Sequence, residues 1–407
     1  MQDTVVSSVI DTKKNKLKRQ IIGELYRAQS RTISQLASLI HTSIPSATAL
    51  IDELSIGQWV QVIGTGTAQF GRKPSLFALN PNRYVTLVID INVHDTKLLV
   101  FNLANEVIHR QDVDLRLDNS GALLNILLEP LEQLAQRIGV ANQYIIGVGV
   151  ALPGLVNPRQ GINYTYPSLS KPEQSLSDLL HNLFGAPVYL INDTQATIVG
   201  EYRFGLAKGK SHVLSVNIDW GIGLGVIING EILQGSAGFA GELGHIQMKT
   251  DGDLCHCGKV GCLDTVASAS ALIRRARLGL QEGRASLLAE EDPDTIDIEL
   301  IIDKANAGDA FCIDLLTDVG NELGRGLSTA VHLFNPELII INGVLAKAQK
   351  AITRPIEQAI AKYCLFNYQD NLSIELSRLG EMAKLYGTQA YVLQNLLEQE
   401  QIPFLMA

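Results

Sequence analysis

The sequence is poor in cysteine and has no long apolar run, and both shortages narrow the class of protein. Only five cysteines occur in 407 residues, and so small and odd a number does not build a disulfide framework. No run of about 18 apolar residues occurs, and the polar N-terminus contains lysines. We therefore expect neither a signal peptide nor membrane insertion, and a cytoplasmic location. With 46% hydrophobic and 18% charged residues, the composition is typical of a globular chain of two or three domains.

Positive charge is also scarce overall, but it is concentrated at one end of the chain. The formal net charge is −9, yet the stretch through Pro81 holds nine basic and five acidic residues. The first fifth of the chain therefore carries +4 and the remainder −13. This asymmetry favours a small module that faces a polyanion and a larger module that does not.

Apolar residues at helical spacing predict three helices near the N-terminus. They cover residues 16–29, 35–40 and 43–57. Ser43 is a suitable N-cap for the third helix, and Pro45 falls in its first turn. Two short helices joined by a tight turn indicate a helix-turn-helix.

Two strand-like runs follow these helices, at 59–63 and 76–79. The glycine-rich segment between them carries two cations, Arg72 and Lys73. A basic hairpin directly after a helix-turn-helix predicts a winged helix, whose partner is double-stranded DNA.

In such a module the third helix enters the major groove, where we expect the polar side chains of Ser43, Ser46 and Thr48. Arg72 and Lys73 would reach phosphates or a narrow minor groove. Five cations around the first helix would meet the DNA backbone: Lys13, Lys14, Lys16, Lys18 and Arg19. The third helix contains no Arg or Lys, so base reading must also rest on apolar contacts to thymine methyls. The alternative is a helical docking domain that binds protein, although a basic hairpin tip has no obvious purpose there.

Three of the five cysteines lie within eight positions of one another, close to two histidines. A structural Zn²⁺ takes four nitrogen or sulfur ligands, and four such donors are present: His245, Cys255, Cys257 and Cys262. His256, between two cysteines that would already hold the ion, is the less favoured fourth ligand. The alternative is a set of buried, unliganded cysteines, but such density beside a histidine favours zinc.

Beyond Tyr84 short apolar runs alternate with helical patterns. Predicted strands lie at 85–91, 97–103, 145–151, 213–218 and 225–230, with a helix over 121–138. The second pair of strands echoes the first, which predicts an α/β fold with two similar lobes. Further helices are predicted over 309–316 and 320–333, and over 346–362, where Pro355 would kink or split the helix.

Together with the winged helix, several motifs resemble the ROK family (repressors, open reading frames and sugar kinases): Ala151-Leu152-Pro153-Gly154, Asn192-Asp193, Gly241-Glu242-Leu243-Gly244-His245 and the cysteine run ending at Asp264. The resemblance covers nearly the whole chain, and the winged helix marks the repressor branch, similar to glucose- and N-acetylglucosamine-responsive repressors. It implies an N-terminal winged helix-turn-helix followed by a two-lobed actin/hexokinase-like (ribonuclease H-like) domain with a zinc site. The implied domains are residues 1–82, a first lobe of 83–195 completed by a C-terminal helix at 387–407, and a second lobe of 196–386.

The resemblance also implies a sugar site in the cleft between the lobes, formed by Gly154, Asn192, Asp193, Glu242, His245 and Asp264. Zinc would close the loop that carries Glu242 and His245. Asp193 matches the general base of the family's kinases. Family members usually carry Glu at the position of Asp264. Because the Asp264 side chain is shorter than Glu, the sugar contact that the resemblance implies for Asp264 is in doubt. For each of these acids, the structural alternative is a hydrogen bond to a loop amide.

The turns that hold ATP phosphates in the family's kinases are altered here. The first turn reads Asp-Ile-Gly-Gly-Thr-Lys in those kinases, whereas residues 90–95 read Asp-Ile-Asn-Val-His-Asp. The second reads Gly-Thr-Gly-Ile-Gly, whereas residues 219–223 read Asp-Trp-Gly-Ile-Gly. A third glycine-rich run keeps one glycine within 341–345. Because phosphate oxygens approach the backbone most closely at glycine, these losses argue against ATP binding and against catalysis.

The sequence therefore predicts a sugar-responsive transcriptional regulator, a repressor of genes for carbohydrate uptake or metabolism. Its effector would be a sugar or sugar phosphate, and a homodimer or homotetramer would bind a palindromic operator. Some family repressors respond to a regulatory protein partner instead, and that alternative stays open. The alternative from another class is a ROK-type kinase that phosphorylates a hexose or N-acetylhexosamine.

Overall fold

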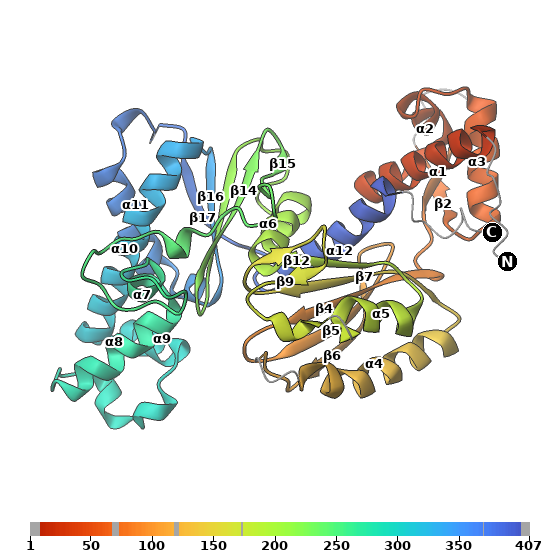
Figure 1. The fold of residues 1–407 in the computed structure, drawn as a ribbon. Helices are drawn as coiled ribbons and strands as arrows, with labels where there is room; N and C mark the ends of the chain where they lie inside the picture. Colours follow the sequence, from red (N-terminus) through yellow and green to blue (C-terminus); the bar gives the residue numbers. More distant parts are fainter. Residues whose placement is uncertain (1–8, 67–72, 118–121, 172–173, 369, 400–407) are drawn as a thin grey trace. The chain divides into compact units, whose positions relative to one another are not determined.

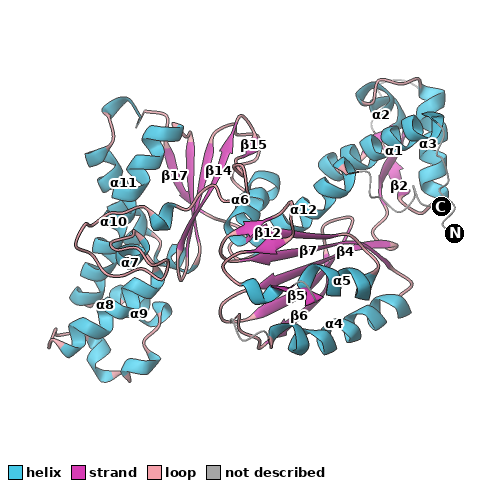
Figure 2. Cartoon of the chain, in the orientation of Figure 1, coloured by secondary structure: helices cyan, strands magenta, loops and turns pink. Residues whose placement is uncertain are grey.

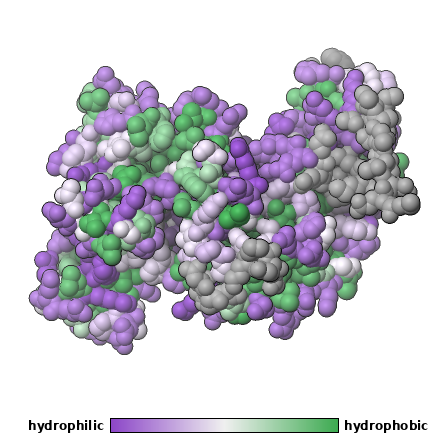
Figure 3. Space-filling view, viewed as in Figure 1, coloured by the Kyte–Doolittle hydropathy of each residue, from purple (hydrophilic) through white to green (hydrophobic). Residues whose placement is uncertain are grey.

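A computed structural model describes residues 9–66, 73–117, 122–171, 174–368 and 370–399 (Figures 1 and 2). The chain separates into two compact units, one formed by Met1–Ile191 with Thr388–Ala407 and the other by Asn192–Gly387. Each unit contains its own five-stranded mixed sheet. In the space-filling view, polar side chains cover much of the visible surface, with hydrophobic patches between them (Figure 3).

The N-terminal module of the first unit has the predicted three helices and two wing strands. They are α1 (Val9–Ala28), α2 (Ile33–Leu39), α3 (Ile44–Ile56), β2 (Val60–Thr65) and β3 (Ser75–Leu79), and β1 (Arg31–Thr32) joins the small sheet in the order β1-β3-β2. Thr32 and Gln35 form a capping box that begins α2, and the Ser43 hydroxyl caps α3 by accepting from Ser46 N. Apolar faces of all three helices enclose a small core that includes Leu25, Leu36, Ile51 and the fully buried Trp59.

The larger sheet of the first unit has the strand order β12-β7-β4-β5-β6. Its strands are β4 (Tyr84–Ile91), β5 (Thr96–Asn102), β6 (Val107–Val113), β7 (Tyr144–Leu152) and β12 (Val188–Asn192). Helices α4 (Leu123–Val140) and α5 (Leu176–Phe184) share a core with Val148 and Val150 of β7. Helix α12 (Met382–Glu398) covers the opposite face. Its Val392 side chain lies so near Gly147 and Gly149 that a Cβ atom at either position would be within 2.7 Å of it. Four short strands follow β7 and pair into two small sheets, β8 (Val156–Asn157) with β9 (Ile162–Asn163) and β10 (Ser170–Lys171) with β11 (Gln174–Ser175).

The second unit repeats this topology. Its strands are β13 (Val213–Ile218), β14 (Ile222–Ile228), β15 (Glu231–Ile232), β16 (Leu338–Asn342) and β17 (Ser373–Leu376), in the order β15-β14-β13-β16-β17. In both units the first strand pairs antiparallel with the second and parallel with the fourth. The predicted repeat of two similar lobes is therefore confirmed.

Helices cover both faces of the second sheet. Helix α6 (Asp193–Phe204) packs through Ile198 on one face, and the other face carries α7 (Asp264–Ala267), α8 (Ala269–Gln281), α9 (Ile298–Asn306), α10 (Ala310–Phe334) and α11 (Lys350–Tyr363). None of the described helices combines the length and apolarity that crossing a bilayer requires.

Two helix predictions in this unit differ from the structure. Helix α10 is continuous where two helices were expected, because buried residues recur along its whole length and hold it against α11. Helix α11 begins at Lys350, after the 3-10 turn η5 (Val344–Ala348), and runs through Pro355 without splitting. Pro355 is buried against Gly320 of α10, so tertiary packing maintains the helix across the missing N–H donor.

Candidate metal centre and effector site

The four predicted metal ligands come together in the second unit. One ligand atom from each of His245, Cys255, Cys257 and Cys262 lies within 4.8 Å of the others. The sulfur of Cys255 is 3.7 Å from His245 Nδ1, and the sulfurs of Cys257 and Cys262 are 3.7 Å apart. A tetrahedral site with Zn–S bonds of about 2.3 Å has edges of about 3.8 Å, so the donor set and its spacing fit Zn²⁺.

Local turns bring these ligands together. His245 ends the 3-10 turn η2 (Leu243–His245), and β-bridges pair Gln247 with Cys262 and Leu254 with Val260. Gly261 has a φ of +74°, and a Cβ atom there would lie 1.6 Å from the carbonyl oxygen of Lys249. Only glycine permits this close return of the chain, which places Cys262 beside His245.

A second, overlapping donor set consists of His245, Cys255, His256 and Asp264. His256 Nδ1 also lies 3.7 Å from the sulfur of Cys255. However, the Asp264 carboxylate already accepts a hydrogen bond from Ile222 N at 2.8 Å. The first set offers three thiols and leaves that hydrogen bond intact, so it suits a soft ion better.

An acidic cluster adjoins the metal ligands. The ring of His245 directs Nδ1 toward Cys255, while its Nε2 lies 3.9 Å from Glu242 Oε2. Burial, with the nearby charges of Asp193 and Asp264, raises the pKa of Glu242 to about 7. The cluster therefore presents an imidazole nitrogen and several carboxylate oxygens, the groups that bind sugar hydroxyls.

Asn192 and Asp193, at the junction of β12 and α6, hold the start of the helix through hydrogen bonds to its backbone. Asn192 is the N-cap of α6, and its Oδ1 accepts from the N–H groups of Thr194 and Gln195 at 2.9 and 3.1 Å. Asp193 Oδ1 accepts from Thr194 N at 2.7 Å. Both side chains are thus held at the N-terminus of a helix, where its dipole favours negative charge.

The structure brings five of the six predicted sugar residues into the second unit. Asp193, Glu242, His245 and Asp264 lie close enough to perturb one another electrostatically. Asp264 is only 7% exposed, which supports the structural alternative for its carboxylate. Gly154 belongs to the first unit, in the turn after β7.

Two altered turns contain contacts that sequence reasoning missed. In the turn between β4 and β5, the amide of Asn92 donates to Asp90 Oδ2 at 3.0 Å and to Asp95 Oδ1 at 3.2 Å. In the second unit, Asp219 Oδ1 accepts from Val344 N at 2.7 Å, and its Oδ2 accepts from Asn217 Nδ2 at 3.0 Å. The polar residues of these two turns are therefore hydrogen-bonded within the chain. The sequence predicted that both turns differ from the kinase pattern, but the hydrogen-bond partners could not be inferred from that prediction.

The predicted DNA residues lie at the N-terminus of α3 and on the wing. Ser43 and Ser46 are exposed and Thr48 is half-buried, while Lys73 is exposed on the wing and Arg72 lies outside the described residues. Three of the cations expected to meet the DNA backbone are engaged or buried within the module. Lys14 and Lys18 form ion pairs with Glu53 of α3 at 2.5 and 2.9 Å, and Arg19 is only 7% exposed. The two ion pairs connect α1 to α3.

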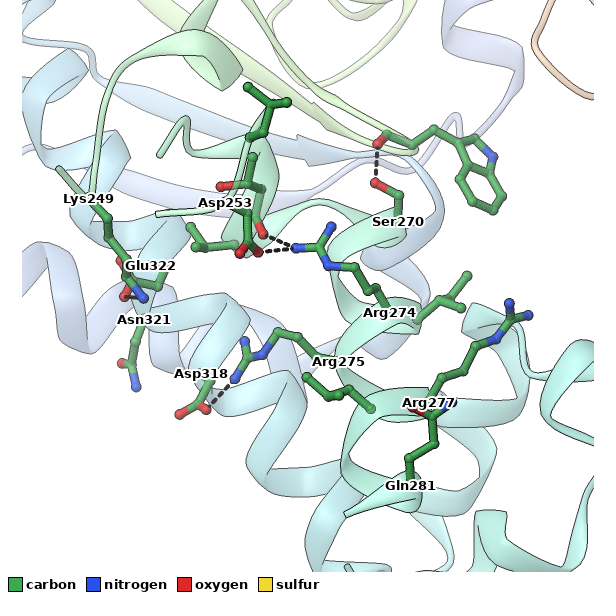
Figure 4. Close-up of a pocket in the computed structure, with 16 residues that line it drawn as sticks. Lys249, Asp253, Ser270, Arg274, Arg275, Arg277, Gln281, Asp318, Asn321 and Glu322 are labelled. Atoms are coloured by element: carbon green, nitrogen blue, oxygen red, sulfur yellow. Dashed lines mark hydrogen bonds and ion pairs between the residues drawn. The ribbon is translucent and has the colours of Figure 1, made fainter. Parts of the chain in front are cut away.

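A separate pocket of about 1100 Å³ lies in the second unit between α8, α10 and the metal-binding segment (Figure 4). Its charged groups are largely paired with one another: Lys249 with Glu322, Arg274 with Asp253, and Arg275 with Asp318. None of the predicted sugar or metal residues lines it. This pocket is therefore distinct from the acidic cluster.

Comparison with known proteins agrees with the geometry. The ROK family model matches residues 86–395. A putative xylose repressor of Caldicellulosiruptor sp. (strain Rt8B.4) is 29% identical over 371 residues, which is 90% of this chain and 93% of that protein. The DNA-binding transcriptional dual regulator NagC of Escherichia coli (strain K12) is 29% identical over 363 residues, covering 89% of this chain and 87% of NagC.

Solved structures give the same result. The crystal structure of a ROK family transcriptional regulator, a homologue of the E. coli Mlc protein, matches with a TM-score of 0.80 and 28% identity over 95% of this chain and 99% of that one. A ROK family glucokinase from Streptomyces griseus, in complex with glucose and AMPPNP, has a TM-score of 0.65 and 25% identity, covering 76% of this chain and 99% of its own. Because the family model matches most of the sequence and the repressors match nearly all of it, the chain belongs to the ROK family.

Proposed function

We propose that this protein is a sugar-responsive, DNA-binding transcriptional repressor. The observation that carries the proposal is the extent of similarity: repressors align with about 90% of the chain, whereas the glucokinase covers 76% of it. The family model begins at residue 86, after the winged helix-turn-helix whose three helices and wing strands are described above. A module of this kind positions a helix in the major groove of double-stranded DNA.

Zn²⁺ is the metal that we assign to His245, Cys255, Cys257 and Cys262. With four protein ligands it has no open position, so its role is structural. Bound through Nδ1, the ion would fix the ring of His245 and leave Nε2 beside Glu242 for an effector hydroxyl.

The effector is a sugar or sugar phosphate that contacts Asn192, Asp193, Glu242 and His245 of the second unit. Asp193 then acts as a hydrogen-bond acceptor and not as a catalytic base. Asp264 supports the site through Ile222 N and does not contact the sugar. Effector binding changes operator affinity only if the two conformations of the protein bind it differently.

Catalysis is not part of this proposal. Asn92 joins Asp90 to Asp95 in the first turn, and Asp219 binds Val344 N, so groups near the nucleotide turns are engaged within the chain. The alternative is a ROK-type kinase. Incubating the purified protein with ATP and a panel of hexoses and N-acetylhexosamines distinguishes them, because turnover at ordinary kinase rates of about 1–100 s⁻¹ would establish the alternative.

Regulation is tested by selecting DNA sequences from a random pool with the full chain. We expect a palindromic site bound by a cytoplasmic homodimer or homotetramer, with affinity that changes when the correct sugar is added. A thermal-shift screen of sugars and sugar phosphates identifies that effector. Failure to enrich any sequence, even at low salt, contradicts the repressor proposal, and a response only to a protein partner contradicts the sugar assignment.

A further inference from the structure

The exposed face of α3 lacks the side chains that most often read bases. The helix sequence from Ile44 to Ile56 contains no Arg, Lys, Asn, Gln or His. Guanine is usually read by Arg or Lys and adenine by Asn or Gln, each through paired hydrogen bonds. Neither pairing is available to this helix.

The hydroxyl groups of the first turn are engaged within the helix. Thr48 Oγ1 donates its only proton to the carbonyl oxygen of Ile44 at 2.9 Å. The hydroxyls of Ser43 and Ser46 lie 2.9 Å apart and share a hydrogen bond, and Ser43 Oγ also accepts from Ser46 N at 3.3 Å. These bonds reduce the capacity of the three hydroxyls to discriminate bases, although all three were expected to do so.

Apolar side chains make up much of the exposed surface at the start of α3. Ile44 is the first residue of α3, and 56% of its surface is exposed, while Pro45 and Ala49 beside it are also exposed. Leu39 at the end of α2 is 46% exposed. In contrast, Ala47 and Leu50 of the same helix are buried in the module core, and Ile44 is not part of that core.

The major groove offers one apolar group of matching chemistry, the C5-methyl of thymine. The first turn of α3 contains no acidic residue. Of the two acids further along the helix, Glu53 is held by Lys14 and Lys18, and Asp52 is exposed. The first turn of α3 is therefore apolar and uncharged. It is better suited to contact thymine methyl groups than to hydrogen-bond guanine in the major groove.

We propose that Ile44 is a specificity-determining residue that reads thymine methyl groups in each operator half-site. This inference rests on the proposed function, because it assumes that α3 enters the major groove. Replacing thymine by deoxyuridine removes the methyl group and keeps every base-pairing hydrogen bond. Burying one methyl group corresponds to about a fourfold change in affinity.

The test uses the full chain and the DNA site obtained by selection, with thymines replaced one at a time by deoxyuridine. Fluorescence anisotropy should show about a fourfold loss of affinity at one or two positions per half-site. Ile44→Ala should bind the unmodified site more weakly and show no further loss on deoxyuridine substitution at those positions. Ile56→Ala is the matched control, because Ile56 is 83% exposed at the other end of α3; it should keep the wild-type response.

The inference is overturned if selected DNA binds equally well with every thymine replaced, or if the Ile44→Ala protein keeps the full response. Circular dichroism melting of both variants verifies that they fold. If no DNA sequence is selected at all, the proposed function itself fails, which is a different result from sequence-specific binding that ignores the methyl groups.

Discussion

Asp264 and Ile222 are 42 positions apart in the chain, yet the carboxylate of Asp264 accepts a hydrogen bond from the backbone N–H of Ile222 at 2.8 Å. Asp264 begins α7 directly after the metal-binding segment, and Ile222 begins β14. Because Asp264 follows Cys262 by two residues, this bond ties the candidate metal centre to the central sheet of the second unit. It also accounts for the burial of an acid for which the family resemblance had suggested a sugar contact.

Asp264→Ala should destabilise the protein. The variant leaves the Ile222 N–H without its partner, and an unsatisfied buried donor costs about 1–3 kcal/mol. Unfolding in urea, followed by circular dichroism, measures the change. Asp253→Ala is the control, because Asp253 forms an exposed ion pair with Arg274 that contributes about 0–1 kcal/mol. Equal losses in the two variants would contradict the structural role of Asp264.

Cys257→Ser should release the metal. Cys257 is exposed, so the substitution changes a ligand and leaves the apolar core intact. Metal analysis should fall from about one zinc per chain toward zero, with a lower melting temperature because metal binding and folding are coupled. Cys364→Ser is the control, since Cys364 lies outside the ligand cluster and its sulfur already faces the Ser328 carbonyl. Full zinc retention in Cys257→Ser would show that the ligand assignment is wrong.

Lys73→Ala should weaken DNA binding in a salt-dependent way. One lost phosphate contact reduces the slope of log affinity against log salt by about one. Titrations at several salt concentrations measure that slope. Lys347→Ala, which removes an exposed cation paired with Glu299 in the second unit, should leave it unchanged. An unaltered slope in Lys73→Ala would mean that this part of the wing does not contact phosphate.

Glu201→Gln should become more stabilising as the pH rises. Glu201 is fully buried, accepts from Ser377 Oγ at 2.5 Å and from Leu206 N at 3.1 Å, and burial raises its pKa above the ordinary 4.5. Because the fold favours the protonated form, wild-type stability is highest below the unfolded pKa and declines as the pH rises through the folded pKa. Glutamine has no charge to bury, and its single side-chain oxygen can still accept from Leu206 N, whereas its amide nitrogen cannot accept from Ser377 Oγ. The difference in melting temperature, variant minus wild type, should therefore increase between about pH 4 and pH 8.

Glu299→Gln is the control with the opposite sign. The hydrogen bond from Lys347 lowers the pKa of Glu299, so this partly exposed acid stabilises the fold above its unfolded pKa and loses that effect in acid. Its variant should be slightly less stable than wild type near neutral pH and approach it in acid. A pH-independent difference for Glu201→Gln would contradict the burial of a titrating carboxyl group.

Local signals in the sequence were sufficient for much of this structure. Ser43 and the apolar spacing after it predicted the third helix, and the density of cysteines beside His245 predicted the four donors that the structure brings together. Both patterns act over a few residues, where hydrogen bonding and helical periodicity are decided locally. The repeated strand pairs similarly indicated two related sheets.

Contacts between distant segments could not be inferred in the same way. Lys14 and Lys18 appeared available to DNA, but the fold places Glu53 beside them. Asp219 appeared only as an acid in an altered turn, and its partner Val344 N is 125 positions away. The continuity of α10 depends on its packing against α11. The intrinsic helix propensities of its residues do not predict that packing.

Helix α12 belongs to both compact units, since the division falls between Gly387 and Thr388. Val392 lies against Gly147 and Gly149 of β7, so the sheet beside the DNA-binding module is covered by residues that are translated after the entire second unit. Folding of the first unit therefore cannot finish on the ribosome in N-to-C order, as is usual for successive domains. A nonsense mutation within α12 would leave the apolar face of β7 uncovered and mark the whole regulator for proteolysis, including a DNA-binding module whose own sequence is intact.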